Sequence, residues 1–392
     1  MKIESLKIKN YKVFKDVCVD SIPSFAVFLG KNGVGKTTFF DVFGFLHDCL
    51  VGNVNSALAR RGGFREVVSR DQDGDIEFEI KFRPAENEPL TTYELSIGLG
   101  ERKLPVVKHE VLRLRRGQKG APWKVLEFYE GEGNAAEGEL NTYDDVKLAE
   151  RKTQKLESPD ILAIKGLGQF KEFAAISSFR KLIEDWYVAD LRVDSARERH
   201  ETEYSERLSR TGDNLSEVTK FIYDNYPEIF DDIIAKMSQR VPGVSKVEAT
   251  LTADGYVVLR FQNGAFKNPF ASKFVSDGTI KMFTYLVLLN DPIKHALLCV
   301  EEPENQLYPE LLEALAEEFQ MYSAKDGQVF VSTHSPDFLN AVDLENIFVL
   351  EKQDGFTNIK RASDNELAYS LFKSGDRPGY LWMQRLLTEG GL

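Results

Sequence analysis

The sequence lacks any apolar run of the roughly 18 residues that a membrane-spanning helix needs. Its longest apolar runs, at residues 39–46 and 285–289, are short and interrupted. Residues 1–5 lead directly into alternating charged and apolar residues, with no signal-peptide pattern. We therefore expect a soluble protein that stays in the cytoplasm and does not contact a membrane.

Cysteine is also scarce, with three residues in a chain of 392. Cys18, Cys49 and Cys299 stand far apart in the sequence and form no C-x-x-C pair. This spacing suggests neither a disulfide framework nor a zinc site. Because each cysteine has apolar neighbours, we expect all three to be small buried hydrophobic side chains.

Basic residues are outnumbered, with 50 Lys and Arg against 62 Asp and Glu, which gives a net charge of −12. A protein that coats nucleic acid is usually basic, so the balance disfavours that class but leaves a local patch possible. Two basic clusters, Arg113–Lys119 and Arg192–Arg199, are interpreted as solvated surfaces. A third arginine-rich segment, Arg60–Arg65, is interpreted as a solvated turn, although its arginines could instead reach toward a ligand.

The chain does contain alternating strand and helix patterns, which are typical of the α/β class. The continuous apolar run at Phe25–Leu29 predicts a central strand that is covered on both faces. A mainly helical pattern covers residues 170–238, and a Gly- and Glu-rich loop is expected at residues 130–141. Further strands are expected at residues 2–8, 13–19, 75–82, 92–99, 107–114, 123–129, 246–252 and 256–261, with 75–82 and 92–99 antiparallel.

These patterns predict four parts along the chain. The first, residues 1–55, is an α/β lobe with a Gly-rich loop, and a β-rich subdomain at residues 56–130 follows it. Residues 131–240 form a loop and a mainly helical insertion. The last part, residues 241–392, completes the α/β head with a Ser-x-Gly turn, an acidic strand end and a histidine loop.

A phosphate-binding loop is the strongest motif of the sequence. Residues Gly30–Thr37 read G-K-N-G-V-G-K-T and fit the pattern G-x-x-x-x-G-K-[ST] throughout. A buried strand precedes the motif and an apolar-periodic helix, residues 37–46, follows it, which a chance glycine-rich turn would not explain. Backbone N–H groups and the helix N-terminus would hold a polyphosphate. Lys36 would bridge the β- and γ-phosphates, and Thr37 would offer its hydroxyl to Mg²⁺.

A pair of acidic residues follows a second buried strand, expected at residues 295–300. Ligands of open α/β sheets bind at the carboxyl ends of the strands, where Glu301 and Glu302 would lie. Glu301 would hold the magnesium shell, usually through water, and Glu302 would act as general base toward the attacking water. The two glutamates could instead be solvated surface charges. The presence of a matching phosphate loop in the same chain makes that interpretation less favoured.

A third strand, at residues 328–332, would deliver His334 to the same edge of the sheet. There His334 could donate a hydrogen bond to the γ-phosphate, whereas an isolated histidine is more often structural. Ser335 and Pro336 would cap and begin the next helix. The turn of Ser276 and Gly278 also precedes an apolar-periodic helix and could form a second anion site, although a plain N-cap serine explains it as well.

The order of these motifs resembles the stand-alone ABC-type ATPases of the RecF/SMC/OLD group, AAA-type proteins of prokaryotic defence or repair cassettes. The opening segment, residues 3–14, also looks like the start of those proteins. The resemblance covers about the first 50 and the last 150 residues and implies an ABC-type P-loop ATPase head. It also implies that this head carries a β-rich subdomain and a mainly helical insertion.

In that family two heads sandwich ATP and Mg²⁺, so the resemblance implies a homodimer in which Ser276 and Gly278 contact the ATP held by the partner's phosphate loop. Residues 304–307 match the loop that crosses between subunits. The sequence departs from the family where Glu301 replaces the commoner Asp and where Ser-Asp-Gly-Thr replaces Ser-Gly-Gly-Gln. Catalytic roles are implied for Lys36, Glu302 and His334, metal binding for Thr37 and Glu301, and ATP binding for Gly30, Asn32, Gly33, Gly35, Lys36, Thr37, Thr38, Ser276 and Gly278.

Three functions remain open at this stage. The stretch after His334 is too short for a TOPRIM nuclease domain, and the chain lacks the heptads of a long coiled-coil arm. The first, which the resemblance implies, is a hydrolysing ATPase that senses a foreign protein or nucleic acid and regulates a separately encoded effector, such as a nuclease, in anti-phage defence. The second is a scaffold that ATP locks with little turnover. The third is a RecF-like repair ATPase that acts on DNA.

Overall fold

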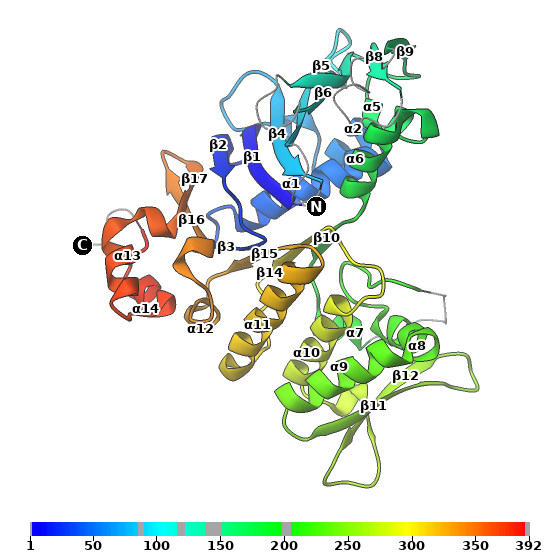
Figure 1. The fold of residues 1–392 in the computed structure, drawn as a ribbon, viewed down its shortest axis with the longest axis vertical. Coiled ribbons are helices and arrows are strands. Elements are labelled where there is room, and N and C mark those ends of the chain that lie inside the picture. Colours follow the sequence, from blue (N-terminus) through cyan, green and yellow to red (C-terminus); the bar gives the residue numbers. More distant parts are fainter. Residues whose placement is uncertain (1, 85–89, 116–121, 138–150, 198–204, 389–392) are drawn as a thin grey trace. The chain divides into compact units, whose positions relative to one another are not determined.

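The computed structural model describes residues 2–84, 90–115, 122–137, 151–197 and 205–388. The chain divides into two compact units (Figure 1). The first comprises Met1–Trp186 with Glu345–Asn365, and the second comprises Tyr187–Leu344 with Glu366–Leu392. The four-part division expected from the sequence stays a prediction.

The first unit contains an eight-stranded antiparallel sheet in the order β2-β1-β4-β5-β6-β7-β8-β9. Apolar and polar residues alternate along β4 in phase with burial, as a sheet with one covered face requires. The expected antiparallel pairing of residues 75–82 with 92–99 is confirmed as β4 with β5. The strands are β1 (Lys2–Tyr11), β2 (Phe14–Asp20), β4 (Ile76–Arg83), β5 (Thr91–Leu99), β6 (Pro105–Leu114), β7 (Trp123–Tyr129), β8 (Glu132–Ala136) and β9 (Arg151–Lys155).

Aromatic side chains of helix α1 (Lys36–Val51) fill the core of this unit. Phe39 lies 4.2 Å from Phe28 and Phe45 lies 5.5 Å from Tyr11 between ring centroids, so the helix packs on strands from two sheets. Strand β3 (Phe25–Leu29) pairs in parallel with β16 (Ile347–Gln353), which pairs antiparallel with β17 (Phe356–Arg361). The remaining helices are α2 (Val54–Ala59), α3 (Phe64–Val67), α5 (Ala163–Leu167), η1 (Lys171–Phe173), α6 (Ala174–Glu184) and η4 (Ala362–Asp364).

The second unit places the parallel strands β14 (Leu297–Glu301) and β15 (Gln328–Thr333) side by side, with β10 (Trp186–Ala189) next to β14. A three-stranded antiparallel sheet of β11 (Val244–Leu251), β12 (Val257–Asn263) and β13 (Phe270–Ala271) packs on α8 and α9. The helices are α7 (Val193–Ala196), α8 (Leu215–Asn225), α9 (Pro227–Arg240), η2 (Ser272–Phe274), α10 (Asp277–Leu289), α11 (Pro309–Lys325), α12 (Pro336–Leu339), α13 (Glu366–Lys373) and α14 (Pro378–Met383); η3 (Leu344–Asn346) spans the boundary.

Several local expectations were wrong. Residues 130–141 were expected to form a loop, but Glu132–Ala136 is strand β8, which pairs with β7 and β9; residues 138–141 lie outside the described part. Cys49 and Cys299 are buried as expected, but Cys18 is exposed because it occupies an outward position of β2. The strand expected at residues 295–300 begins at Leu297, since the backbone of His295 bonds instead to the Tyr322 hydroxyl.

None of the helices within the described ranges combines the length and apolar character that a bilayer crossing requires.

Candidate functional site

The phosphate loop lies between β3 and α1 in the first unit, where the motif predicted it. Gly33 and Gly35 have φ angles of 77° and 111°, in the left-handed region that favours glycine. A Cβ atom at Gly35 would also lie 2.8 Å from Val13 Cγ2, so the backbone approaches too closely for a side chain. The loop ends where α1 begins, and the first N–H groups of that 16-residue helix have no acceptor within the helix. This geometry suits a bound anion.

Lys36 folds back over the loop that it belongs to. It is 5% exposed, and Nζ donates hydrogen bonds to the carbonyl oxygens of Gly30 at 2.8 Å and Lys31 at 3.4 Å. These carbonyls hold the ammonium group at the loop, where a phosphate could take their place as its acceptor. Three residues of the loop, Asn32, Gly33 and Thr37, are exposed to solvent, so a polyphosphate would contact them directly. Thr38 is partly buried.

A residue that the sequence did not reveal supports the loop from β17. Thr357 is 1% exposed, and its hydroxyl donates a hydrogen bond to the Val34 carbonyl oxygen at 2.6 Å. Its backbone N–H donates to the carbonyl oxygen of Val13 at 2.9 Å. A lone threonine in a strand far along the chain gives no local signal of this role.

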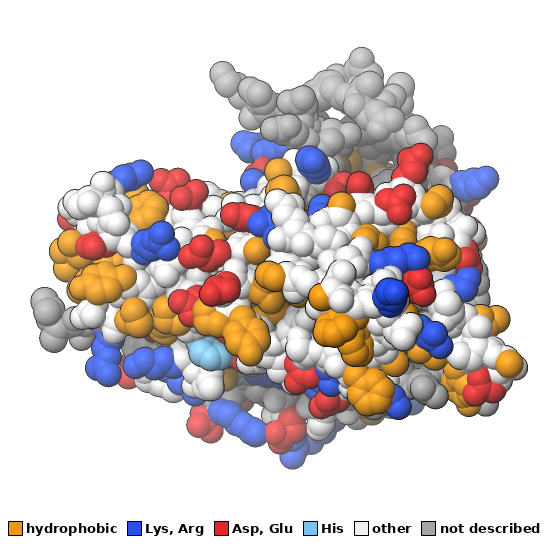
Figure 2. All heavy atoms as spheres, turned by 90° about the horizontal axis from the view of Figure 1, so that it is seen from below, with side chains coloured by type: hydrophobic (Ala, Val, Ile, Leu, Met, Phe, Trp, Pro, Cys, Tyr) orange, Lys and Arg blue, Asp and Glu red, His pale blue; other side chains and the backbone are white. Residues whose placement is uncertain are grey.

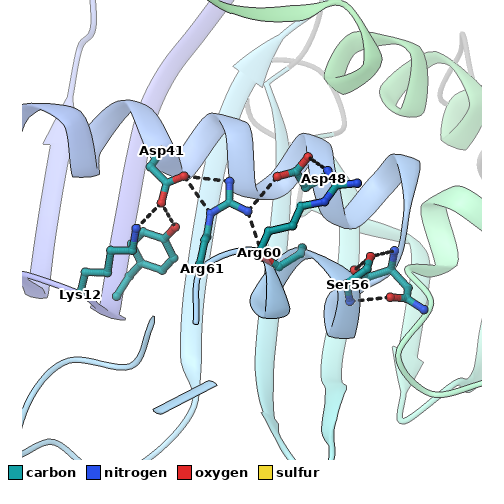
Figure 3. Close-up of polar contacts among 9 residues, drawn as sticks. Lys12, Asp41, Asp48, Ser56, Arg60 and Arg61 are labelled. Carbon is teal, nitrogen blue, oxygen red and sulfur yellow. Dashed lines mark hydrogen bonds and ion pairs between the residues drawn. The ribbon is translucent and has the colours of Figure 1, made fainter. Parts of the chain in front are cut away.

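A partly buried ion-pair network fixes α1 to the segment that follows it (Figure 3). The Arg61 guanidinium is 10% exposed and pairs with Asp41 and Asp48 of α1, each at 2.8 Å. The Tyr11 hydroxyl and Lys12 Nζ bind the second Asp41 oxygen at 2.7 and 2.5 Å. Burial alone would raise the pKa of Asp41, but the charges of Arg61 and Lys12 hold that pKa below its ordinary value. The interpretation of this arginine as part of a solvated turn was therefore wrong.

In the second unit the chain brings Glu302 and His334 together at one sheet edge, as the sequence analysis expected. Strands β14 and β15 run parallel with Glu301 opposite Ser332, so the residues that follow them emerge at one sheet edge. His334 Nδ1 lies 3.5 Å from Glu302 Oε1. Glu302 has a φ of 42°, an uncommon value for a residue other than glycine, and its N–H donates to the Ser332 carbonyl oxygen at 2.9 Å. Such strained positions are common at functional sites.

Glu304 also contacts His334, which sequence reasoning missed because it assigned Glu304 only to a loop between subunits. The hydroxyl of Thr333 and the N–H of His334 both donate to Glu304 Oε1, at 2.8 and 2.9 Å. Asn305 Nδ2 lies 3.4 Å from Glu302 Oε2, so the same turn also contacts the first carboxylate.

Ser276 is the N-cap of α10, with Oγ accepting a hydrogen bond from the Thr279 N–H at 3.3 Å. A structural capping role is thus present, whereas contact of Ser276 and Gly278 with ATP stays a prediction. Asp277, one of the departures from the family pattern, pairs with Arg197 at 2.7 Å. A Cβ at Gly278 would lie 3.4 Å from the Gln306 carbonyl oxygen, an ordinary contact distance.

The donors expected for magnesium suit that ion, because Thr37 offers a hydroxyl and Glu301 a carboxylate. Within the described ranges no group of three or more His, Cys, Asp or Glu side chains could hold a metal. A hydroxyl such as that of Thr37 would leave most of the magnesium shell to phosphate and water oxygens, as magnesium sites usually do.

The basic clusters are largely neutralised where the structure describes them. Arg113 pairs with Glu94, and Arg192 pairs with Asp190 at 2.7 Å. Arg116, Lys119 and Arg199 lie outside the described residues. Figure 2 shows acidic and basic side chains interspersed on the face that it draws, without a wide field of one sign among its coloured residues.

Known proteins resemble this chain in sequence over part of its length. The RecF proteins of Lactococcus lactis subsp. cremoris (strain MG1363) and subsp. lactis (strain IL1403), named "DNA replication and repair protein RecF", are each 23% identical over 144 residues. These alignments cover 34% of this chain and 40% of each relative. The chain thus spans less than half the length of the curated relatives that it matches.

Solved structures resemble the fold over nearly the whole chain. An Smc head bound to the C-winged helix domain of ScpA has a TM-score of 0.55 at 15% identity, covering 92% of this chain and 98% of that one. An Smc head with an extended coiled coil, bound to the C-terminal domain of ScpA derived from Pyrococcus furiosus, has a TM-score of 0.50 at 13% identity, covering 95% and 99%. The expected α/β ATPase head is confirmed.

A family model described as "AAA domain, putative AbiEii toxin, Type IV TA system" matches residues 25–340, well over half of the chain. That span begins at β3 and ends after His334, so it includes the phosphate loop as well as Glu302, Glu304 and His334. The chain belongs to this AAA domain family and is an ABC-type ATPase of the RecF/SMC group.

Proposed function

We propose that the protein binds MgATP at the Gly30–Thr37 loop and hydrolyses it to ADP and phosphate. The observation that carries this proposal is the loop itself, with left-handed Gly33 and Gly35, exposed Thr37 and a poised Lys36 at the N-terminus of α1. Family membership in the AAA domain group supports the same ligand.

Each proposed residue has one task in the reaction. Lys36 binds the β- and γ-phosphates, and the N–H groups of the loop and helix stabilise their negative charge. Glu302 accepts a proton from the water whose oxygen forms the new bond to the γ-phosphorus, while the bond from that phosphorus to the β–γ bridging oxygen breaks. His334 hydrogen-bonds the γ-phosphate. Thr37 would hold Mg²⁺ directly and Glu301 would hold it through water, and the ion would neutralise charge at the phosphates.

The proposed active form is a homodimer. In it, Ser276 and Gly278 of one copy would contact the γ-phosphate held by Lys36 of the other. Ser276 lies at the N-terminus of α10, a 13-residue helix, and such a terminus favours an anion. The Ser276 hydroxyl oxygen caps α10 by accepting a hydrogen bond from the Thr279 N–H. In the proposed dimer Ser276 would keep this N-cap position while it contacts the phosphate.

We place the ATPase as a sensor and regulator of a separately encoded effector, such as a nuclease, in anti-phage defence. Two observations support a protein partner. The matching family description names a toxin and a toxin–antitoxin system, and one structural neighbour is a head bound to a domain of ScpA.

Two other functions have specific support. The RecF relatives favour direct action on DNA, although they cover 34% of the chain. The Ser-Asp-Gly-Thr turn, with Asp277 engaged by Arg197, favours a scaffold that ATP locks with little turnover. DNA affinity that does not change between about 50 and 200 mM salt would exclude binding through phosphate contacts. Rapid multiple turnover would exclude the scaffold.

A nucleotide-binding measurement on the purified full chain tests the proposal. We expect Lys36→Ala to abolish measurable ATP binding and turnover because it removes the cation that contacts the phosphates. Lys31→Ala is the matched control, since Lys31 lies in the same loop with an exposed side chain. Equal ATP affinity in the two variants would contradict the proposed site. Sedimentation of the Glu302→Gln variant with and without ATP tests the dimer, which should form only with nucleotide.

A further inference from the structure

One carboxylate joins the turns that follow β14 and β15. Glu304 Oε1 accepts hydrogen bonds from the Thr333 hydroxyl at 2.8 Å and from the His334 N–H at 2.9 Å. The same oxygen lies 3.2 Å from His334 Nδ1. The Glu304 side chain is 8% exposed, so these donors replace most of the water that would otherwise solvate its charge.

We propose that Glu304 is a positioning residue that orients His334 and holds the ring proton on Nδ1. A protonated Nδ1 would be attracted to the Glu304 oxygen 3.2 Å away, whereas an unprotonated Nδ1 would place its lone pair against that oxygen. Glu302 Oε1, at 3.5 Å, faces the same nitrogen and favours the same arrangement. Nε2 is then the ring nitrogen directed to a ligand. The consequence for turnover rests on the proposed ATPase function, whereas the ring arrangement does not.

The backbone of His334 is held as well as its ring. Trp382 Nε1, in α14, donates a hydrogen bond to the His334 carbonyl oxygen at 3.3 Å. Because Glu304 accepts a hydrogen bond from the His334 N–H, both the N–H and the carbonyl oxygen of His334 have hydrogen-bond partners. The histidine is therefore placed by two neighbours from different elements, which limits its freedom before any ligand arrives.

Glu304 also acts electrostatically on a buried lysine. Lys281 of α10 is 4% exposed and donates to the Leu191 carbonyl oxygen. Burial lowers the pKa of Lys281 to about 8, while the charges of Asp190 and Glu304 oppose this effect. Glu304 Oε2 is buried and has no hydrogen-bond partner among the described residues.

NMR of ¹⁵N-histidine-labelled full-length protein, without nucleotide and on the alkaline side of the imidazole titration, tests the ring arrangement. The chain has five histidines, and a His334→Gln variant assigns the signal of interest. We expect neutral His334 to be protonated at Nδ1, the form that free histidine disfavours. Glu304→Met should shift His334 to the Nε2-protonated form, and Glu304→Gln, which keeps an acceptor oxygen, should retain the Nδ1 form.

Wild-type His334 protonated at Nε2 would overturn the proposal, and this spectrum requires no variant to fold. An unchanged His334 signal in Glu304→Met would also overturn it. In steady-state assays Glu304→Met should lower turnover about 10- to 100-fold, the usual cost of a misplaced catalytic group, and Glu304→Gln should lower it less. A changed tautomer with unchanged turnover would refute a role in positioning for catalysis. Absence of turnover in the wild type would refute the ATPase function and leave the spectral result valid.

Discussion

Thr357 donates a hydrogen bond from its hydroxyl to the carbonyl oxygen of Val34 over 2.6 Å, although 323 residues separate them. The acceptor lies inside the phosphate loop, and the donor lies in β17. Because Thr357 is buried, no water can replace this bond without entering the core. The shape of the loop therefore depends on a strand from the far end of the chain.

Thr357→Val should destabilise the fold by about 1–3 kcal/mol, because it leaves the Val34 carbonyl without its donor. ATP affinity should fall too, since the loop would lose a support. Chemical denaturation and nucleotide titration measure the two effects. Thr357→Ser keeps the hydroxyl and should retain most of the affinity. Wild-type ATP affinity in the valine variant would show that the loop holds its shape without β17.

Arg60 and Arg61 are adjacent and both pair with Asp48, but they differ in burial, with side chains 67% and 10% exposed. Arg61→Met should lower the free energy of unfolding by about 1.5–3 kcal/mol, because Asp41 and Asp48 each lose a charge-assisted hydrogen bond from a side chain that is 10% exposed. Arg60→Met should cost at most about 1 kcal/mol, as exposed pairs do. Urea denaturation of the two variants gives the comparison. Equal losses would contradict the structural role of the network in Figure 3.

Glu110 should make stability depend on pH. It is fully buried, and burial raises its pKa to about 7, while N–H donors from Ile164 and Ala163 and the Tyr93 hydroxyl oppose this effect. Between about pH 4.5 and 7 the unfolded chain loses this proton and the folded chain keeps it. The free energy of unfolding should therefore fall by about 3 kcal/mol across that window and then level off.

A comparison of the wild type with Glu110→Gln across pH isolates this contribution. As pH rises from about 4.5 to above 7, the unfolding free energy of the wild type should fall relative to that of Glu110→Gln. Glu101→Gln, at an exposed position, should show a constant difference from the wild type. A constant difference for Glu110→Gln as well would mean that the folded state does not retain the Glu110 proton.

The sequence predicted the features that depend on local patterns. The phosphate loop was predictable because its glycines, Lys36 and Thr37 are contiguous, and because β3 and α1 have their own apolar signatures. The strand ends of β14 and β15 were predictable for the same reason, and their parallel pairing brings Glu302 to His334.

Features that depend on distant partners were not predictable. Arg61 reads as part of a polar turn until Asp41 and Asp48 of α1 are seen to face it. Thr357 gains its role from the Val34 carbonyl, and backbone carbonyls leave no mark in a sequence. Cys18 was misplaced because apolar neighbours in an alternating strand lie on the opposite face, so they say little about its burial.

The most direct measurement of the central claim is the MgATP turnover of Glu302→Gln beside that of Glu310→Gln, whose side chain is exposed at the start of α11. Turnover should fall about 10²- to 10⁴-fold in Glu302→Gln, the usual contribution of a general base, while ATP still binds. Glu310→Gln should retain wild-type turnover. Undiminished hydrolysis by Glu302→Gln would contradict the assignment of this carboxylate as the base.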